Sequence, residues 1–492
     1  MAVTRLSKSQ FIRGLQCPKS LWLYKYKPEL RQGPDEALQA IFDTGHEVGT
    51  LAQRLFPGGT TISYQPAKLY ENVNKTAGLI RSGVEIIYEA TFLHDDVLVM
   101  IDILHKGPEG WELYEVKSST SVSEVYLNDV AIQYYVAKGS GVDLKKAFVV
   151  HINNQYVRQG ELDIPSLFTI SPQTESVIQL QAFISSELQK LKEIVTKGST
   201  EPARDIDLYC DDPYECDFKG YCWQDIPDES VFSLYFMKKQ KKFDLYRQGI
   251  IKFNQIDSDI PLTTIQQMQV EAALTGQEFI NREGIFEFIN EIAEPIGFLD
   301  FETFYTAVPR FDNQKPYQQI PFQYSLHVQN NGILLHHEFL AEHGSDPRVE
   351  FIENLINTTT DLETILVYNA AFERRILNEL KQSHPSYAHE IDSIIEKLVD
   401  LLVVFKSGNY YVRAMDGSFS IKKVLPAIVP GFSYDNLNIS EGGMAMNAYK
   451  GLEKMTDKAE INKVRNDLLE YCNLDTLAMV KIYEKLKQSL DH

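Results

Sequence analysis

Two carboxylates stand two residues apart where a run of apolar residues ends. The run 296–299 leads into Asp300 and Glu302, which one phenylalanine separates. Side chains two apart in a strand face the same side, and paired carboxylates hold two divalent cations about 4 Å apart in enzymes of phosphoryl transfer. Such pairs are also common on solvated strands, but a carboxylate on a buried strand is costly to leave unpaired. The pattern predicts a Mg²⁺ or Mn²⁺ site.

Two later segments carry residues that suit the same site. Glu373 opens an expected helix after the strand-like run 366–368. Tyr471 and Asp475 lie four residues apart in the expected last helix, 458–490, which places them one turn apart on one face. Taken alone, that pair is an ordinary half-buried tyrosine beside a surface acid. Asp400, in the apolar run 398–402, either supports the site or caps a helix.

Together these segments resemble the three motifs of DEDD exonucleases, in the variant whose third motif contains a tyrosine. The resemblance implies an RNase H-like α/β domain with a mixed sheet that trims nucleic acid from a 3′ end. It implies that the tyrosine orients the attacking water and that the acids bind metal. The implied tyrosine is Tyr471, and the implied metal ligands are Asp300, Glu302, Glu373 and Asp475. The family usually has aspartate at the position of Glu373, and the extra methylene shifts the metal.

A second set of residues suited to metal chemistry lies nearer the N-terminus. One expected strand ends on Asp102, and the next carries Glu115 and Lys117, which face one side by alternation. Two carboxylates there suit a Mg²⁺ ion that polarises a phosphate, and the lysine suits the positioning or activation of the attacking water. The alternative is an ordinary ion pair on a solvated strand.

These residues, with an acid on an earlier helix and a glutamine on a later one, resemble the PD-(D/E)XK nucleases of the RecB type. The family often has a histidine on the first helix, so His46 competes with Glu47 for that position, and we favour Glu47. The implied metal ligands are Glu47, Asp102 and Glu115, and the implied catalytic residues are Lys117 and Gln133.

The cysteines form a pattern of one early residue and three late ones. The chain has five, an odd count, and in an intracellular chain their clustering favours metal ligation over disulfides. The pattern resembles the iron–sulfur RecB-like nucleases, among them CRISPR-associated and AddB-type enzymes, and so implies a [4Fe-4S] cluster that ties the domain's ends together. Four thiolates also suit zinc, the less favoured alternative. The expected ligands are Cys17, Cys210, Cys216 and Cys222, and Cys472 is expected to be a core thiol.

The chain of 492 residues is too long for a single core. We predict an α/β protein with a PD-(D/E)XK restriction-endonuclease-like domain at 1–228, a helical connector at 229–290 and an RNase H-like domain at 291–492. The connector contains the basic run 238–242, and 11–26 has apolar residues at helical spacing. The chain shows no apolar leader at its start and no run long enough to span a membrane, so a cytoplasmic location is expected.

A net charge of −20 argues against simple adhesion to phosphates, but bound cations reverse the field locally. We therefore predict a metal-dependent nuclease that hydrolyses phosphodiester bonds at two sites, with DNA favoured over RNA, in DNA repair or the processing of foreign DNA. A helicase or repair partner is left open. The alternatives are an RNA 3′–5′ exonuclease, or a nucleic-acid-binding adaptor whose first site is inactive. The order of parts resembles an uncharacterised bacterial family that fuses the two nuclease types. Lys422, in the expected strand-to-helix turn 417–426, either contacts phosphate or is a solvated lysine, and we favour the second.

Overall fold

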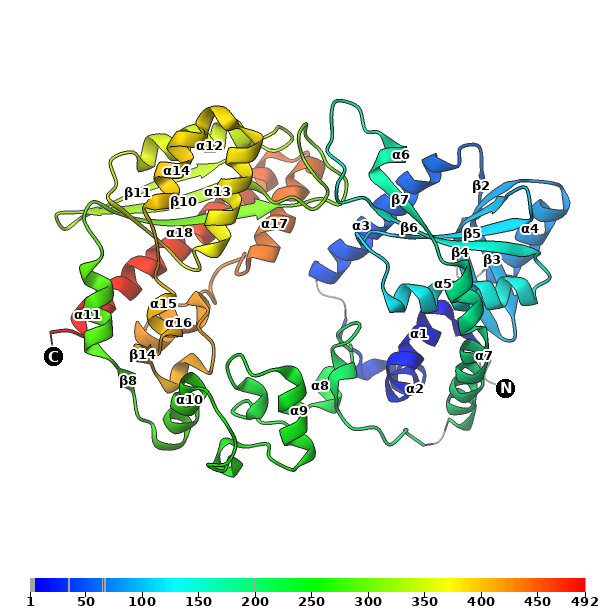
Figure 1. Ribbon diagram of the computed structural model, residues 1–492, viewed down its shortest axis with the longest axis horizontal. Helices are drawn as coiled ribbons and strands as arrows, with labels where there is room; N and C mark the ends of the chain where they lie inside the picture. Colours follow the sequence, from blue (N-terminus) through cyan, green and yellow to red (C-terminus); the bar gives the residue numbers. More distant parts are fainter. Residues whose placement is uncertain (1–4, 34–35, 64, 66–67, 199, 492) are drawn as a thin grey trace. The chain divides into compact units, whose positions relative to one another are not determined.

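The computed structural model describes residues 5–33, 36–63, 65, 68–198 and 200–491 (Figure 1). The chain is a mixed α/β protein, as predicted, and it divides into two units. The first is Met1–Asp225 together with Thr306–Gln318, and the second is Ile226–Tyr305 together with Gln319–His492. The segment expected to be a connector, 229–290, is thus part of the second unit.

The first unit is built on a seven-stranded sheet of order β2-β3-β4-β5-β6-β7, with β1 paired to β4. The strands are β1 (Leu6–Ser7), β2 (Thr60–Thr61), β3 (Ile86–His94), β4 (Val97–Lys106), β5 (Trp111–Lys117), β6 (Leu144–Ile152) and β7 (Phe168–Pro172). Asp95 and Asp96 both have positive φ, as a two-residue turn between antiparallel strands requires, so β3 and β4 form a hairpin. β4 continues four residues beyond the predicted end at Asp102.

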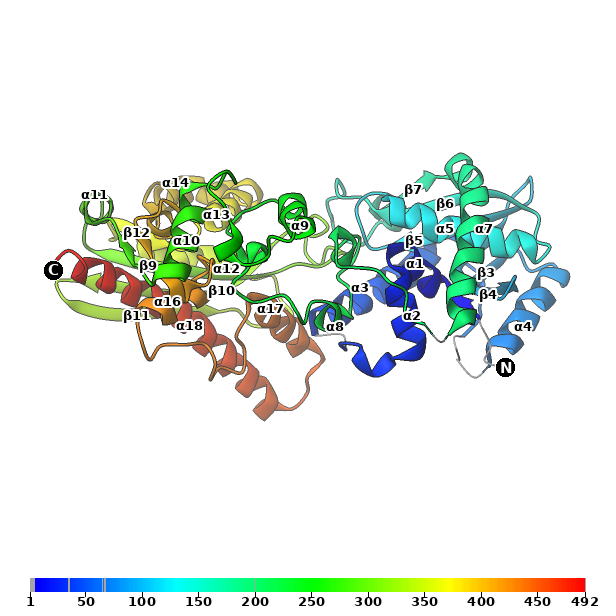
Figure 2. The ribbon, with the colours of Figure 1, turned by 90° about the horizontal axis from the view of Figure 1, so that it is seen from below.

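Helices cover this sheet and create its main core. They are α1 (Lys8–Gln16), α2 (Pro18–Tyr26), α3 (Glu36–Ala52), α4 (Leu69–Arg81), α5 (Glu124–Gly139), α6 (Ile164–Leu167), α7 (Thr174–Lys197) and α8 (Lys219–Cys222). Figures 1 and 2 both show α5 and α7 side by side. The segment 11–26 has apolar residues at helical spacing throughout, but it forms two helices. The break occurs because Pro18 pushes the preceding Cys17 into extended backbone.

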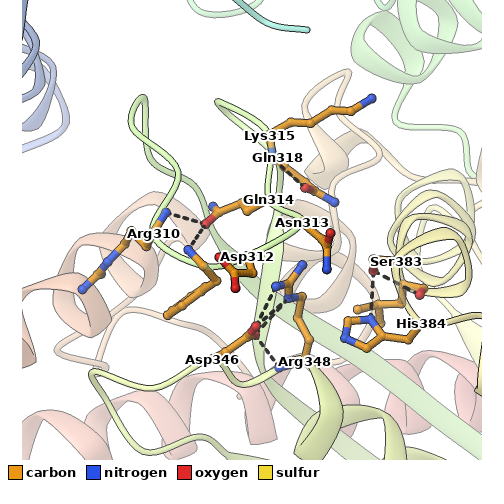
Figure 3. A network of polar contacts seen from close by, with 12 residues as sticks. Arg310, Asp312, Asn313, Gln314, Lys315, Gln318, Asp346, Arg348, Ser383 and His384 are labelled. Atoms are coloured by element: carbon orange, nitrogen blue, oxygen red, sulfur yellow. Dashed lines mark hydrogen bonds and ion pairs between the residues drawn. The ribbon is translucent and has the colours of Figure 1, made fainter. Parts of the chain in front are cut away.

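The segment Thr306–Gln318 completes a second apolar cluster of the first unit. Ala307 is 3% exposed and packs in the same cluster as Val48 of α3 and Tyr114 of β5. The Oε1 atom of the buried Gln314 accepts the backbone N–H groups of Arg310 and Phe311, which folds the segment on itself (Figure 3). The first unit is therefore not continuous in sequence.

The second unit is built on a five-stranded sheet of order β11-β10-β9-β12-β13. The strands are β9 (Ile296–Phe304), β10 (Ile320–Asn330), β11 (Ile333–Leu340), β12 (Thr364–Val367) and β13 (Leu398–Asp400), and a small pair is β8 (Phe279–Ile280) with β14 (Tyr410–Tyr411). The first three of the five are antiparallel neighbours, and β12 and β13 run parallel to β9. β9 is therefore the central strand.

Helices lie on both faces of this sheet, with α18 along one face and α12 to α14 on the other (Figure 1). The helices of the unit are α9 (Lys239–Arg247), α10 (Thr264–Thr275), α11 (Arg282–Asn290), α12 (Arg348–Thr359), α13 (Ala371–Ser383), α14 (Ala388–Glu396), α15 (Val403–Lys406), α16 (Ile421–Ile428), α17 (Gly442–Gly451) and α18 (Lys458–Gln488). In the described part of the chain, no helix has both the length and the apolar character to cross a membrane.

Replacing Ala307 by aspartate is expected to destabilise the first unit by roughly 3 kcal/mol, because the new carboxylate would be buried without a partner. Thermal unfolding followed by circular dichroism measures this as a lower melting temperature. Lys315→Asp is the matched control, since Lys315 is an exposed residue of the same segment. Equal melting temperatures for the two variants would contradict the packing of Thr306–Gln318 in this core.

Candidate active sites

Three acidic side chains come together in the second unit. Asp300 and Glu302 lie two residues apart on the central strand β9, and α18 packs against that strand and brings Asp475 to them. One oxygen of each lies within 4.8 Å of the others. Within the described ranges, no other three His, Cys, Asp or Glu side chains meet this condition. The structure thus brings together three of the four acids implied as ligands.

Hydrogen bonds to three alternating residues of β10 fix the position of α18. Gln323 Nε2 donates to the carbonyl of Leu468 at 2.8 Å. The hydroxyl of Thr476 lies 2.7 Å from that of Ser325 and 2.9 Å from Nδ1 of His327. Because Thr476 follows Asp475 directly, these bonds hold the helix in the rotation that turns Asp475 towards β9.

Burial of these acids makes their ionisation unfavourable. Burial, followed by the charges of Asp475, Glu302 and Glu373, raises the pKa of Asp300 well above its usual range. Burial and Asp475 raise the pKa of Glu302 to about 8, and burial raises that of Asp475 to about 6. A divalent cation relieves such repulsion, and carboxylate oxygens are the ligands that Mg²⁺ and Mn²⁺ prefer. The donor set therefore fits the expected metal.

Two side chains that the sequence analysis did not assign to this site lie beside it. The hydroxyl of Tyr434 donates to Asp475 Oδ1 at 2.7 Å. The Lys422 ammonium lies 5.6 Å from the ring centre of Tyr434 and 5.1 Å from that of Tyr471, and its charge acts on Glu302 and Asp475. Lys422 is thus a partly buried residue beside the site, which suits the alternative of a phosphate contact better than the favoured interpretation as a solvated lysine. Tyr434 belongs to an irregular segment, where no periodicity points to it.

Glu373 is a fourth buried acid, outside the group of three. It is 2% exposed, and its Oε2 atom has no hydrogen-bond partner among the described residues. Burial raises its pKa to about 8, and its charge is one of those that act on Asp300. Asp400 instead accepts the backbone N–H groups of Asn369 and Leu402, at 2.9 and 3.0 Å. Asp400 therefore supports the backbone, whereas Glu373 retains an oxygen available to a ligand.

In the first unit, the residues expected on β4, β5 and α5 gather around Glu115, which is 1% exposed. Lys117 Nζ lies 2.8 Å from Glu115 Oε1, and Gln133 Nε2 donates to Oε2 at 2.5 Å. Asp102 Oδ2 accepts the N–H of Val116 at 2.6 Å. Burial, with the charge of Glu115 next, raises the pKa of Asp102 to about 8. The structure thus brings together Asp102, Glu115, Lys117 and Gln133.

A second lysine, which the sequence analysis did not single out, joins this cluster. Lys8 Nζ lies 2.6 Å from Glu115 Oε1, and Lys117 Nζ lies 2.6 Å from Asp129 Oδ2. Burial opposes ionisation of Glu115, but Lys117 and Lys8 lower its pKa to about 2. Lys8 is placed there because β1 pairs with β4 and because Ser7 caps α1, which starts at Lys8.

Glu89 of β3 is a further acid at this cluster. It has φ of 57°, which is uncommon for a residue other than glycine, and the β3–β4 pairing is interrupted where Glu89 faces Asp102. Burial raises its pKa, and the charges that act on it include those of Glu115 and His46. Glu47 and His46, the two residues considered for the position on the first helix, are both exposed on α3, so exposure does not distinguish them.

The four cysteines expected as ligands line one cavity of the first unit, together with Lys19, Arg204 and Tyr209. Burial raises the thiol pKa of three of them, namely Cys17, Cys210 and Cys222. In the described structure no three of the four sulfur atoms lie within 4.8 Å of one another. Cys472 is fully buried against Asp300, as expected of a core thiol.

Comparison with known proteins gives partial matches. Residues 297–420 match a family model described as a domain of unknown function, DUF2779. The chain is 28% identical over 212 residues to "Uncharacterized protein MG366 homolog" of Mycoplasma pneumoniae, and 28% identical over 213 residues to "Uncharacterized protein MG366" of Mycoplasma genitalium. Each match covers 39% of this chain and 32% of the relative. A Ureaplasma parvum protein, "Uncharacterized protein UU173", is 25% identical over 217 residues, which is 39% of this chain and 31% of that protein.

The matched regions cover less than half of this chain and less than half of each relative. The chain spans about a third of the length of the curated relatives it matches. The family model begins within β9 and so includes Asp300, Glu302 and Glu373, but it ends before Lys422 and Asp475. The matched family therefore contains part of the acidic site and carries no stated activity.

We expect Asp300→Asn to change how stability depends on pH in metal-free protein. A buried acid with a raised pKa contributes stability that is complete below its unfolded pKa near 4 and is lost as pH rises through the folded pKa. For the wild type that loss extends to about pH 8, the pKa of Glu302. The isosteric amide removes one repelling charge, so the variant should gain on the order of a few kcal/mol relative to wild type over this range.

Thermal melts in EDTA at several values of pH measure this difference, and Mn²⁺ should raise the melting temperature of the wild type more than that of Asp300→Asn. Glu338→Gln is the control, because Glu338 is an exposed acid on β11. A parallel pH dependence of wild type and Asp300→Asn would contradict the mutual repulsion of the three acids.

Proposed function

We propose that the protein is a metal-dependent nuclease that hydrolyses phosphodiester bonds in DNA. The observation that carries the proposal is the group of Asp300, Glu302 and Asp475, three acids with oxygen atoms within 4.8 Å of one another. Buried carboxylates that repel one another are costly, and they are retained where a cation is to be bound. A mixed sheet with Asp300 and Glu302 on its central strand, and Asp475 on a helix packed against that strand, supports an RNase H-like domain of the DEDD type.

Asp300, Glu302 and Asp475 would hold the cations, with Glu373 as a further ligand through its unpartnered oxygen. Bound Mg²⁺ or Mn²⁺ supplies Lewis-acid activation of a phosphate and of a water molecule. The residues around the four acids position these side chains and influence their ionisation. Tyr434 orients Asp475 through its hydrogen bond.

Lys422 supplies a positive charge to this group of acids. Its ammonium lies over the ring of Tyr471, and it lowers the pKa of both Glu302 and Asp475. That charge favours the ionised state that binds metal, and it attracts the phosphate of a substrate. Tyr471, 3% exposed on the same face of α18 as Asp475, suits the orientation of the attacking water.

The first unit suits a second nuclease centre of the RecB type. Glu115 and Lys117 lie on one face of β5, with Asp102 on the neighbouring strand and Gln133 bonded to Glu115, in the arrangement that this family implies. In the metal-free state both Glu115 oxygens are engaged, Oε1 by Lys8 and Lys117 and Oε2 by Gln133. These contacts already offset the charge of Glu115, so an adaptor with an inactive first site is the rival proposal for this unit.

The four cysteines suit a [4Fe-4S] cluster better than zinc. Tetrahedral zinc with Zn–S distances of about 2.3 Å places its sulfur ligands about 3.8 Å apart, and no three of these sulfurs, in the part of the chain that the structure describes, are within 4.8 Å. A cluster of several iron atoms needs the wider spacing. Because Cys17 is early and the other three are late in the unit, the cluster would hold its two ends together.

We expect a mutation in one centre to abolish the cleavage activity of that centre and to leave the activity of the other unchanged. Asp300→Ala should abolish release of mononucleotides from the 3′ end of single-stranded DNA in Mn²⁺, because it removes a ligand, with a loss of at least 100-fold. Lys117→Ala should leave that release intact and abolish any cleavage by the first unit. Gel electrophoresis of DNA labelled at either end separates the two reactions.

Asn313→Ala is a control, since Asn313 is exposed and lies outside both centres. A parent protein that cuts RNA but not DNA would establish the RNA exonuclease instead. Cleavage by the parent and by Lys117→Ala at equal rates and positions would leave the first unit as an adaptor. Strand binding without any cleavage would defeat the nuclease proposal.

Purification without oxygen should give a brown protein that absorbs near 400 nm, because iron–sulfur clusters are coloured and zinc is not. Cys216→Ser should lose that absorbance and lower the melting temperature of the first unit, while Cys472→Ala, at a cysteine outside the cavity, should keep it. Metal analysis that finds one zinc and no iron would show that the four cysteines hold zinc instead of an iron–sulfur cluster.

A further inference from the structure

An aromatic side chain is turned out into solvent in the second unit. Phe236 is 84% exposed, the highest exposure among the described large apolar residues, and its φ is 49°. A bulky residue with this backbone angle is a genuine outlier. Its ring contacts that of Tyr235, with centres 4.6 Å apart. Neither the burial of apolar surface nor the local backbone preference explains this conformation.

The surrounding structure holds the backbone of this loop in place. Gln269 accepts the N–H of Tyr235 at 2.9 Å and donates to the carbonyl of Ser233 at 2.8 Å, and Gln266 donates to the carbonyl of Tyr235 at 2.8 Å. Both glutamines are buried on α10. On either side of Phe236, Leu234 and Met237 pack in one apolar cluster. A strained angle persists only where its surroundings determine it, and such angles concentrate where ligands are held.

Four lysines follow within six residues of Phe236, in a chain of net charge −20. Lys241 and Lys242 donate to backbone carbonyls, the latter to Phe232 at 2.6 Å. Lys238 and Lys239 are exposed. Lys241 and Lys242 fix the start of α9, and Lys238 and Lys239 lie exposed close to the phenylalanine in sequence.

This surface is connected to the acidic site by direct contacts. The rings of Tyr235 and Phe419 have centres 4.5 Å apart. The carbonyl of Phe419 accepts the hydroxyl of Tyr368 at 2.7 Å. Phe419 stands three residues before Lys422, and Tyr368 five residues before Glu373. The loop thus packs against the segment that leads to Lys422, and that segment is hydrogen-bonded to the one that leads to Glu373.

We infer that Phe236, Lys238 and Lys239 form a strand-binding surface, which takes a single-stranded nucleic acid by stacking a base on Phe236 and pairing phosphates with the lysines. The inference rests on the proposed function of the second unit and adds its substrate class. Aromatic rings beside lysines are the usual means of binding single strands without sequence preference. A duplex keeps its bases stacked inside, so the phenylalanine favours single strands.

Charge decides between a nucleic acid and a protein partner. A protein that covered Phe236 would need no excess of lysine around it, and apolar cores of protein interfaces are poor in lysine. Phosphates reward the lysines, and on a strongly acidic chain a local basic run is the part of the surface that attracts a polyanion.

The test measures binding of a fluorescent 20-nucleotide oligothymidylate by anisotropy, in an Asp300→Asn background so that the strand is not cut. Phe236→Ala should weaken binding about tenfold with an unchanged salt dependence, and Phe236→Trp should restore it. The double variant Lys238→Ala, Lys239→Ala should reduce the steepness with which the logarithm of the association constant falls with the logarithm of salt concentration, by about 1.4. Blunt duplex of equal length should respond little to Phe236→Ala.

The matched controls are Phe286→Ala, at another exposed phenylalanine of this unit, and Lys458→Ala with Lys463→Ala, at two exposed lysines of α18. With Asp300 restored, Phe236→Ala should still hydrolyse the p-nitrophenyl ester of thymidine 5′-phosphate at the parental rate, because that substrate reaches only the acidic site.

Equal binding by Phe236→Ala and Phe286→Ala would overturn the surface, and so would a dimer of the parent that Phe236→Ala dissociates. A parent that binds strands through Phe236 but hydrolyses neither substrate would keep the surface and reject the nuclease. A parent that hydrolyses both substrates, and whose strand binding is changed neither by Phe236→Ala nor by the double lysine variant, would keep the nuclease and reject the surface.

Discussion

The mutual repulsion of Asp300, Glu302 and Asp475 is the constraint on which the second unit depends. Two of these acids come from the central strand of the sheet, so neither can move without moving the sheet. The third is on α18, which the polar residues of β10 hold against the strands. Apolar packing alone would allow the helix to rotate away from the repelling charges. Hydrogen bonds are directional, and they keep Asp475 in place at an electrostatic cost.

Local periodicity explains which parts of the sites could be predicted from sequence. Asp300 with Glu302, and Glu115 with Lys117, are two residues apart on strands, so alternation places each pair on one face. Tyr471 and Asp475 are four apart on a helix. The long apolar strands and the last helix were also predictable, because their patterns extend over many residues.

Contacts between distant segments explain what the sequence did not reveal. Lys8 reaches Glu115 across 107 positions, and Tyr434 reaches Asp475 across 41, with no local pattern at either lysine or tyrosine. The segment Thr306–Gln318 follows β9, a strand of the second unit, yet packs in a core of the first unit. A division of the sequence into consecutive domains therefore cannot assign this segment to the right unit. The sequence alone does not choose between His46 and Glu47, which are adjacent on one helix, because that choice depends on helix rotation, which tertiary packing sets.

The two centres differ in the balance of charge around their carboxylates, and this difference bears on how each would work. In the second unit, Glu373 acts on Asp300 of the group of three acids, and Lys422 acts on Glu302 and Asp475, so the local charge is strongly negative when the four acids are ionised. In the first, Lys8 and Lys117 both contact Glu115, and Lys117 also contacts Asp129, so two ammonium groups offset part of the charge of the acids Asp102, Glu115, Glu89 and Asp129. Under the proposed function, the first centre would meet a phosphate with two ammonium groups of its own, whereas the second would depend on bound cations to offset its acids. An acidic chain would in this way hold two phosphate-directed centres with different sources of positive charge, lysines in one and bound cations in the other.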